Sequence, residues 1–269
     1  MKKILFATVL LAALAPGVLL AAETAPPKPM SADETPLTET DLKLREALMK
    51  GASMEEIAKL KEPAVKTPEA AIHALKRDNS RFFGGMARRP EMSANERRAQ
   101  ILQQTPFAVV VGCSDSRVPI ELVFDQSLGD IFSVRVAGQI VDPATAGSFE
   151  YAVKHLKTKV LVVMGHEGCG AVKAAMLPAA DQAAEPEHVR YLLSQITPAV
   201  SNLPKIRDSK AMMREAVMAN VRKHVALAKE NPVVKAAVAK KELAVVGAFY
   251  EISSGQVDFL ESEEDLRVD

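Results

Sequence analysis

The sequence predicts an α/β fold, in which a central, mostly parallel β-sheet is flanked by helices and preceded by an N-terminal helical extension. Val109-Val110-Val111 and Leu161-Val162-Val163-Met164 are short apolar runs, and each is followed by a glycine. Such runs are typical of strands buried on both faces, which is the usual setting of parallel sheets. Segments with helical periodicity separate the runs, as the crossover connections of a parallel sheet require. Residues 23–269 are enough for one domain of this kind.

The first 22 residues have the three parts of a secretory signal peptide. Met1-Lys2-Lys3 is positively charged, residues 4–14 are almost wholly apolar, and small residues follow. We therefore expect cleavage after Ala21 or Ala22 and a periplasmic or secreted protein that is free of the membrane. An uncleaved membrane anchor is the alternative, but Pro16-Gly17 interrupts an apolar run that is short for a full span.

Residues 23–66 are predicted to form a linker and a helical arm. The segment 25–38 is rich in proline, threonine and acidic residues, which favours a linker without a packed core. Leucines with partly helical spacing follow it. Gly51 interrupts that pattern, and Ser53 is a candidate N-cap for the next helical turn.

The main domain is predicted to span residues 67–261, with an acidic tail at 262–269. Thr67 followed by Pro68 is typical of a helix start, and we expect this helix to run towards Asn79. Ser93-Ala94-Asn95-Glu96 has the pattern of a capping box. The remaining expected strands start at Phe107 and span 131–136 and 160–164, followed by a hairpin of 243–250 with 257–260. The remaining expected helices are a short one up to Gln103, one at 120–124, one at 144–155, one from near Gly170, helical structure with a loop over 176–208, and one at 211–230. We expect Phe149 and Tyr151 in the core, together with a stripe of Met213, Val217, Val221 and Val225 on the helix at 211–230.

Metal-binding side chains follow both apolar runs. Cys113 comes after the first run, and His166 and Cys169 come after the second. Ligands of open α/β sheets bind at the carboxyl ends of the strands, and two thiolates with one imidazole suit zinc. Three protein ligands leave a fourth tetrahedral position for water or another donor. The alternative is a disulfide between Cys113 and Cys169, which two cysteines of an exported protein form by default.

Three motifs resemble the β-class carbonic anhydrases. They are Cys113-Ser-Asp-Ser-Arg-Val-Pro119, Glu150-Tyr-Ala-Val153 and Gly165-His-Glu-Gly-Cys-Gly170, and the similarity runs from about Asn79 to Leu260. One departure from the family pattern is Ala137-Gly138-Gln139, where the family usually has Ala-Gly-Asn.

The resemblance implies a zinc enzyme with one Zn²⁺ per subunit, held by Cys113, His166 and Cys169. Its implied reaction is the reversible hydration of CO₂ to bicarbonate and a proton, by attack of zinc-bound hydroxide. The small molecules CO₂ and bicarbonate are the implied substrates, and the implied assembly is a homodimer or homotetramer. The arm within residues 23–66 then packs either on its own domain or over a partner subunit.

Asp115 and Arg117 stand on alternate positions just beyond the first strand, so their side chains can meet as a bidentate pair. An ordinary salt bridge is one interpretation. The resemblance implies another, in which Asp115 becomes the fourth zinc ligand and closes the site unless Arg117 holds it away. Held away, Asp115 accepts a hydrogen bond from the zinc-bound water. The regulated branch of the family that the chain resembles has a bicarbonate pocket containing tryptophan. This chain has no tryptophan, so the resemblance favours the open, water-ligated form, although the sequence leaves the two forms undecided.

The resemblance also assigns substrate contacts. Gln126 matches a glutamine that donates to the substrate, often from across a dimer interface; a glutamine in a surface turn is the alternative. Gly170, with Gly168, is expected to leave room above the metal.

The charge composition of the chain bears on which other functions are compatible with the sequence. The chain has 34 basic and 34 acidic residues in well-mixed positions, so nothing indicates binding to nucleic acid or to an anionic membrane. Two alternatives to CO₂ hydration remain, namely a zinc hydrolase for COS or CS₂ on the same scaffold and a non-enzymatic exported protein with a disulfide.

Overall fold

A computed structural model describes residues 65–88 and 104–260, together with positions 42, 43, 46, 47, 49–53, 56, 97, 98, 100 and 101. The expected signal peptide at 1–22, the linker at 25–38, most of the expected helix at 93–103 and the acidic tail at 262–269 lie outside these residues. Within the arm, the predicted N-cap is confirmed. Ser53 Oγ accepts the Glu56 N–H at 3.3 Å, and the Glu56 carboxylate accepts the Ser53 N–H at 2.8 Å.

The sheet has five strands in the order β2-β1-β3-β4-β5. The first four are parallel and the last is antiparallel to β4, so the predicted mostly parallel sheet and the C-terminal hairpin are confirmed. The strands are β1 (Ala108–Gly112), β2 (Ile131–Arg135), β3 (Val160–His166), β4 (Ala244–Tyr250) and β5 (Val257–Leu260).

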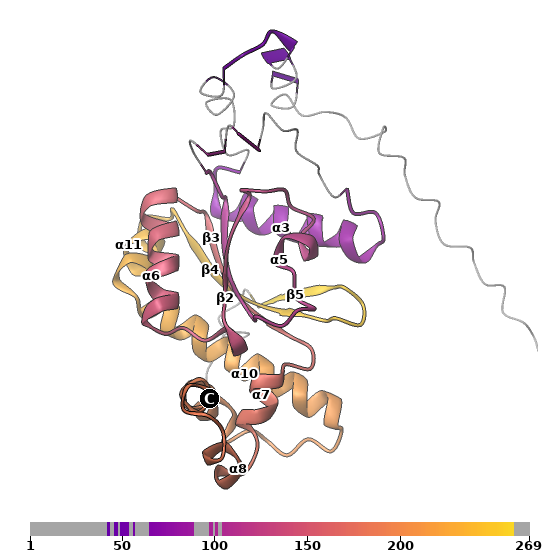
Figure 1. Cartoon of the computed structure of the whole chain (residues 1–269), viewed down its shortest axis with the longest axis vertical. Coiled ribbons are helices and arrows are strands. Elements are labelled where there is room, and N and C mark those ends of the chain that lie inside the picture. Colours follow the sequence, from indigo (N-terminus) through magenta and orange to yellow (C-terminus); the bar gives the residue numbers. More distant parts are fainter. Residues whose placement is uncertain are drawn as a thin grey trace, which may run out of the picture.

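Helices cover both faces of this sheet (Figure 1). One face carries α3 (Pro68–Phe83) and α5 (Ile120–Val123). The other carries α6 (Pro143–Tyr151) with its π-helical continuation η2 (Ala152–Leu156), α7 (Gly170–Ala175), α9 (Glu187–Val200), α10 (Ser209–Glu230) and α11 (Pro232–Ala239). The short elements η1 (Ala137–Gln139) and α8 (Ala179–Ala183) complete the chain order.

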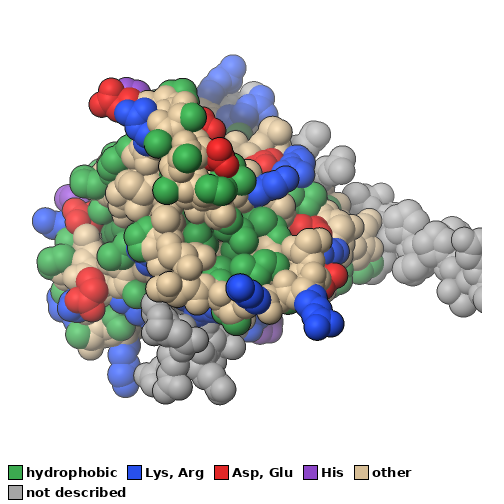
Figure 2. Space-filling view, turned by 90° about the horizontal axis from the view of Figure 1, so that it is seen from below, with side chains coloured by type: hydrophobic (Ala, Val, Ile, Leu, Met, Phe, Trp, Pro, Cys, Tyr) green, Lys and Arg blue, Asp and Glu red, His purple; other side chains and the backbone are tan. Residues whose placement is uncertain are grey.

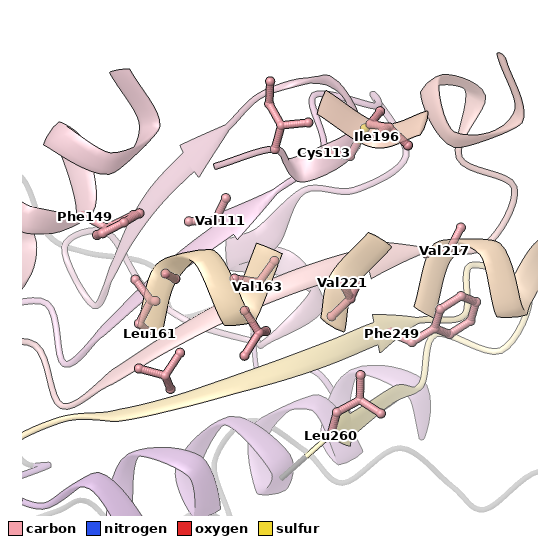
Figure 3. Packing of buried hydrophobic residues seen from close by; sticks show 14 of the residues in the cluster. Val111, Cys113, Phe149, Leu161, Val163, Ile196, Val217, Val221, Phe249 and Leu260 are labelled. Carbon is pink, nitrogen blue, oxygen red and sulfur yellow. The ribbon is translucent and has the colours of Figure 1, made fainter. Parts of the chain in front are cut away.

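Alternation along the strands divides the core between these two faces. Val109 and Val111 of β1 belong to the cluster on the α10 side, whereas Val110 belongs to the cluster on the α3 side. Figure 3 shows Val217 and Val221 of α10 packed over the sheet within the first cluster. The predicted stripe of α10 is confirmed at its three valines, which are buried; Met213 is only partly buried.

The start of α3 is also as predicted. Thr67 Oγ1 accepts the N–H of Ala70, and Pro68 occupies the first helical position. The helix continues past Asn79 to Phe83 and ends at Gly84, one turn later than expected.

The prediction that Tyr151 lies in the core is wrong. Phe149 is fully buried, but Tyr151 is 47% exposed. Residues two apart on a helix point in nearly opposite directions, so burial of Phe149 against the sheet turns Tyr151 outwards. Its ring packs instead against Phe132, at 6.1 Å between ring centroids, and against His155, at 5.2 Å.

The surface carries charges of both signs. Figure 2 shows one face, on which hydrophobic side chains gather at the centre and acidic and basic side chains lie interspersed around them. Among the residues that the structure describes, no helix is both long enough and apolar enough to cross a bilayer.

Candidate metal site

The sheet brings three sequence-distant donor side chains together. Cys113 directly follows β1 and His166 ends β3; these strands are neighbours, with Gly112 paired to Met164. Cys169 precedes α7 at its N-cap position. The two sulfurs and an imidazole nitrogen all lie within 4.8 Å of one another, and the three residues are buried. The predicted convergence of these residues is thus present.

The chemistry of this donor set fits zinc. His166 Nδ1 lies 2.9 Å from the Glu167 carbonyl oxygen, which accepts a hydrogen bond when Nδ1 carries the proton. Nε2 then presents a lone pair; it is fully buried and has no hydrogen-bond partner among the described residues. A backbone carbonyl that fixes the ring of a ligating histidine in this way is a common feature of metal sites. Both cysteines are free, so the disulfide that was the alternative to metal binding is not formed.

The two thiols affect each other's ionisation. Contact with Cys169 lowers the pKa of the Cys113 thiol, with help from His166 and from the N–H groups of Gly138 and Asp115, each 3.4 Å from the sulfur. Contact with Cys113 and burial raise the pKa of Cys169 and outweigh the N–H groups at the start of α7. A second thiolate beside the first therefore requires a cation that neutralises both, which a divalent metal ion supplies.

Asp115 and Arg117 form the predicted pair at the edge of this cluster. Arg117 Nη2 donates to Asp115 Oδ2 at 2.7 Å, and Arg117 Nε donates to Oδ1 at 3.0 Å. The Arg117 guanidinium holds the pKa of the Asp115 carboxyl well below its usual range, so this group is ionised at neutral pH. Asp115 Oδ2 lies 4.0 Å from His166 Nε2. The carboxylate is next to the donor set while both of its oxygens are bonded to arginine.

One supporting residue was missed by the sequence reasoning. Arg135, at the end of β2, donates from Nε to the Cys113 carbonyl at 3.0 Å and from Nη2 to the Asp115 carbonyl at 2.6 Å. Parallel pairing places Arg135 opposite Gly112, at the same sheet edge as the cysteine. A charged residue at the carboxyl end of the strand next to a ligand-bearing strand was the signal for it.

The structure places the two predicted substrate contacts differently. Gly170 is the first residue of α7, and a Cβ added there would meet no atom within 4 Å, which agrees with the expected open space. Gln126 is not brought to the donor set within this chain. Its amide nitrogen donates to Asp78 Oδ2 at 2.6 Å and to the Phe124 carbonyl at 2.8 Å, towards the sheet face covered by α3.

Comparisons with known proteins agree with this geometry. A family model described as carbonic anhydrase matches residues 108–257. Carbonic anhydrase 2 of Mycobacterium tuberculosis is 39% identical over 190 residues, covering 70% of this chain and 91% of the relative. A carbonic anhydrase of Mycolicibacterium smegmatis is 42% identical over 198 residues, covering 71% of this chain and 92% of the relative.

Solved structures are similar over the same part of the chain. A crystal structure from a study of two tetrameric β-carbonic anhydrases of Sordaria macrospora superposes with a TM-score of 0.59 at 27% identity, covering 71% of this chain and 97% of that one. A Coccomyxa β-carbonic anhydrase in complex with acetazolamide gives a TM-score of 0.55 at 26% identity, covering 73% and 86%.

Proposed function

The chain belongs to the β-carbonic anhydrase family, and from this premise we propose that it catalyses the reversible hydration of CO₂ to bicarbonate and a proton at a zinc ion held by Cys113, His166 and Cys169. The observation that carries the proposal is the buried convergence of these three donors within 4.8 Å. Zinc bound by three protein ligands lowers the pKa of a coordinated water to about 7, which supplies hydroxide near neutral pH.

Asp115 and Arg117 have complementary tasks in this reaction. Arg117 occupies both carboxylate oxygens and so would keep Asp115 from joining the donor set when zinc is bound by Cys113, His166 and Cys169. Asp115 remains ionised and adjacent to the donor set, where its carboxylate would accept a hydrogen bond from a water molecule beside the zinc and orient it. Gly168 and Gly170, where an added Cβ would meet no atom within 4 Å, leave room for a small linear substrate.

Metal content combined with turnover tests this function. We expect about one zinc per chain and CO₂ hydration that is already present at about pH 7. Onset of activity only towards about pH 9 would contradict the open form and indicate that Asp115 closes the site. Faster turnover of COS or CS₂ than of CO₂ would reassign the substrate, and a metal-free protein would overturn the proposal.

We propose a homodimer or homotetramer as the assembly. One similar structure is described as tetrameric. β2 is an edge strand, and Leu122, Leu128 and Tyr151 are large hydrophobic residues with exposures of 51%, 58% and 47%. Such side chains are common at subunit interfaces. Light scattering after size exclusion is expected to give two or four times the chain mass, and a monomer would contradict this assignment.

We further propose that the protein is exported to the periplasm or secreted after cleavage at Ala21 or Ala22. The support is the charged, apolar and small-residue order of residues 1–22. Mass spectrometry of the native protein is expected to find a chain that begins at residue 22 or 23. An intact Met1 would contradict cleavage.

A further inference from the structure

Two buried polar side chains of α10 hold the segment that follows β2. Asn220 Nδ2 donates to the Gly138 carbonyl at 2.9 Å, and His224 Nδ1 accepts the Val141 N–H at 3.0 Å. Both side chains are fully buried, and they are one helical turn apart on the face that also carries Val217 and Val221. Asparagine is a weak helix former, and a buried amide is unfavourable unless it is hydrogen-bonded. Asn220 Oδ1 has no hydrogen-bond partner among the described residues, so the bond from Nδ2 to Gly138 is the interaction that accounts for an asparagine on this buried face.

The segment that Asn220 holds has an unusual backbone. Gly138 has φ 71° and ψ 15°, and Gln139, next to it, has φ 45°. Consecutive residues in the left-handed region persist only where their surroundings fix them. Ile196 packs so closely on Gly138 that a Cβ there would lie 2.5 Å from Ile196 Cδ1. Figure 3 shows Ile196 beside Cys113 at this end of the core.

This backbone contacts the metal site directly. The Gly138 N–H lies 3.4 Å from Cys113 Sγ, and the only other backbone N–H bonded to that sulfur among the described residues is that of Asp115. Hydrogen bonds to a ligating thiolate withdraw charge from the sulfur, and such outer contacts tune metal affinity. We propose that Asn220 is a positioning residue of the metal site: by fixing Gly138 through its carbonyl, it keeps the Gly138 N–H on the sulfur of Cys113. This inference rests on the proposed zinc site.

Two variants separate positioning from general stability. Asn220→Leu keeps a side chain of similar size and removes the donor to Gly138. His224→Leu is the matched control, because His224 is equally buried on the same helix face and binds the same segment, but its partner Val141 does not touch the sulfur. The measurements are zinc release from the holoenzyme to a chelator and the sulfur-to-metal charge-transfer absorption of the Co²⁺-loaded protein.

Asn220→Leu is expected to release zinc about tenfold faster and to shift the charge-transfer band. His224→Leu is expected to lower the melting temperature while both readouts stay as in the wild type. Unchanged readouts in Asn220→Leu, or equal changes in the two variants, would overturn the inference. If Asn220→Leu does not fold, Asn220→Ser, whose hydroxyl cannot reach as far, takes its place under the same criteria. A wild-type protein that binds neither metal would instead overturn the proposed function.

Discussion

In the proposed function, the exposed side chain of Arg117 controls whether Asp115 can reach the buried donor set. It binds both oxygens of Asp115, and Asp115 Oδ2 is 4.0 Å from His166 Nε2. If zinc binds as proposed, removal of the guanidinium would free the carboxylate to turn towards the metal and displace solvent. We expect Arg117→Ala to lower CO₂ hydration by about 100-fold while zinc stays bound.

The matched control for this prediction is Lys235→Ala. Lys235 is also exposed and also pairs with a carboxylate, that of Glu230, at 2.6 Å, but it lies on α11, which leads to the amino end of β4, whereas the donors follow the carboxyl ends of β1 and β3. Its removal should leave activity within about twofold of the wild type. Stopped-flow measurement of CO₂ hydration and metal analysis of both variants test this prediction. Full activity in Arg117→Ala would show that the Asp115–Arg117 pair has no role in the mechanism.

Gln139 combines two unfavourable features. Its φ of 45° is one that asparagine adopts more readily than glutamine, and both atoms of its buried amide lack a hydrogen-bond partner within the described part of the chain. We expect Gln139→Asn to raise the free energy of unfolding by about 1 kcal/mol, measured by urea denaturation. Lys157→Asn, at another non-glycine residue with positive φ, is the control for the backbone effect alone. A loss of stability at 139 together with a gain at 157 would contradict this account.

Among the elements, α3 is joined to two neighbouring elements through a single buried asparagine, Asn79. Asn79 Nδ2 donates to the carbonyls of Val123 and Gly255 at 3.0 and 2.9 Å, and Asn79 Oδ1 accepts the Val257 N–H at 2.9 Å. These three bonds tie α3 to α5 and to the β4–β5 hairpin, in a position that is 2% exposed.

Asn79→Ala should therefore lower the free energy of unfolding by about 3 kcal/mol, because three buried backbone groups lose their partner. Ser80→Ala, at the next and exposed position, should change it by less than about 0.5 kcal/mol. Equal effects in chemical denaturation of the two variants would show that the three bonds contribute little.

The sequence was sufficient to predict those elements that are determined by residues close together along the chain. The apolar runs of β1 and β3, the cap at Thr67 and the valine stripe of α10 depend on neighbouring residues, and all are present. It was insufficient where a contact depends on packing between distant elements. Helical periodicity alone could not decide that Phe149 and not Tyr151 faces the sheet.

The residues of the candidate site also fall into those that the sequence could predict and those that it could not. Cys113, His166 and Cys169 could be found because each follows a recognisable strand or turn. The bonds of Arg135 and Asn220 to this region depend on strand register and on how α10 crosses the sheet. No sequence motif indicates the contact of Asn220, and the signal for Arg135 is only its place at the carboxyl end of the neighbouring strand.

For the molecule as a whole, His224 links stability to pH. Burial lowers the pKa of His224 to about 3, aided by the nearby charge of Lys223. The unfolded chain therefore takes up a proton below about pH 6.5 that the folded protein does not bind, so stability is complete above that pH and falls as the medium becomes more acidic. We expect this residue alone to remove about 2 kcal/mol between about pH 7 and about pH 5.

His224→Asn tests this contribution, because asparagine can still accept the Val141 N–H but does not titrate. Its unfolding free energy should depend less on pH over that interval. His188→Asn, at an exposed position, should retain the dependence of the wild type. An unchanged slope in His224→Asn would place the acid sensitivity elsewhere.

The pairing of β1 with β3 has a consequence for the order of events during biogenesis. Gly112 and Met164 are paired in the sheet, but β2 and α6 lie between them along the chain, so Cys113 and His166 come together only when the chain folds. In the unfolded chain, the Cys113 sulfur and the His166 imidazole are far apart and cannot bind the same ion. If the polypeptide crosses a bilayer unfolded, it has to collect its zinc at the destination, so the supply of metal there limits how much working enzyme accumulates.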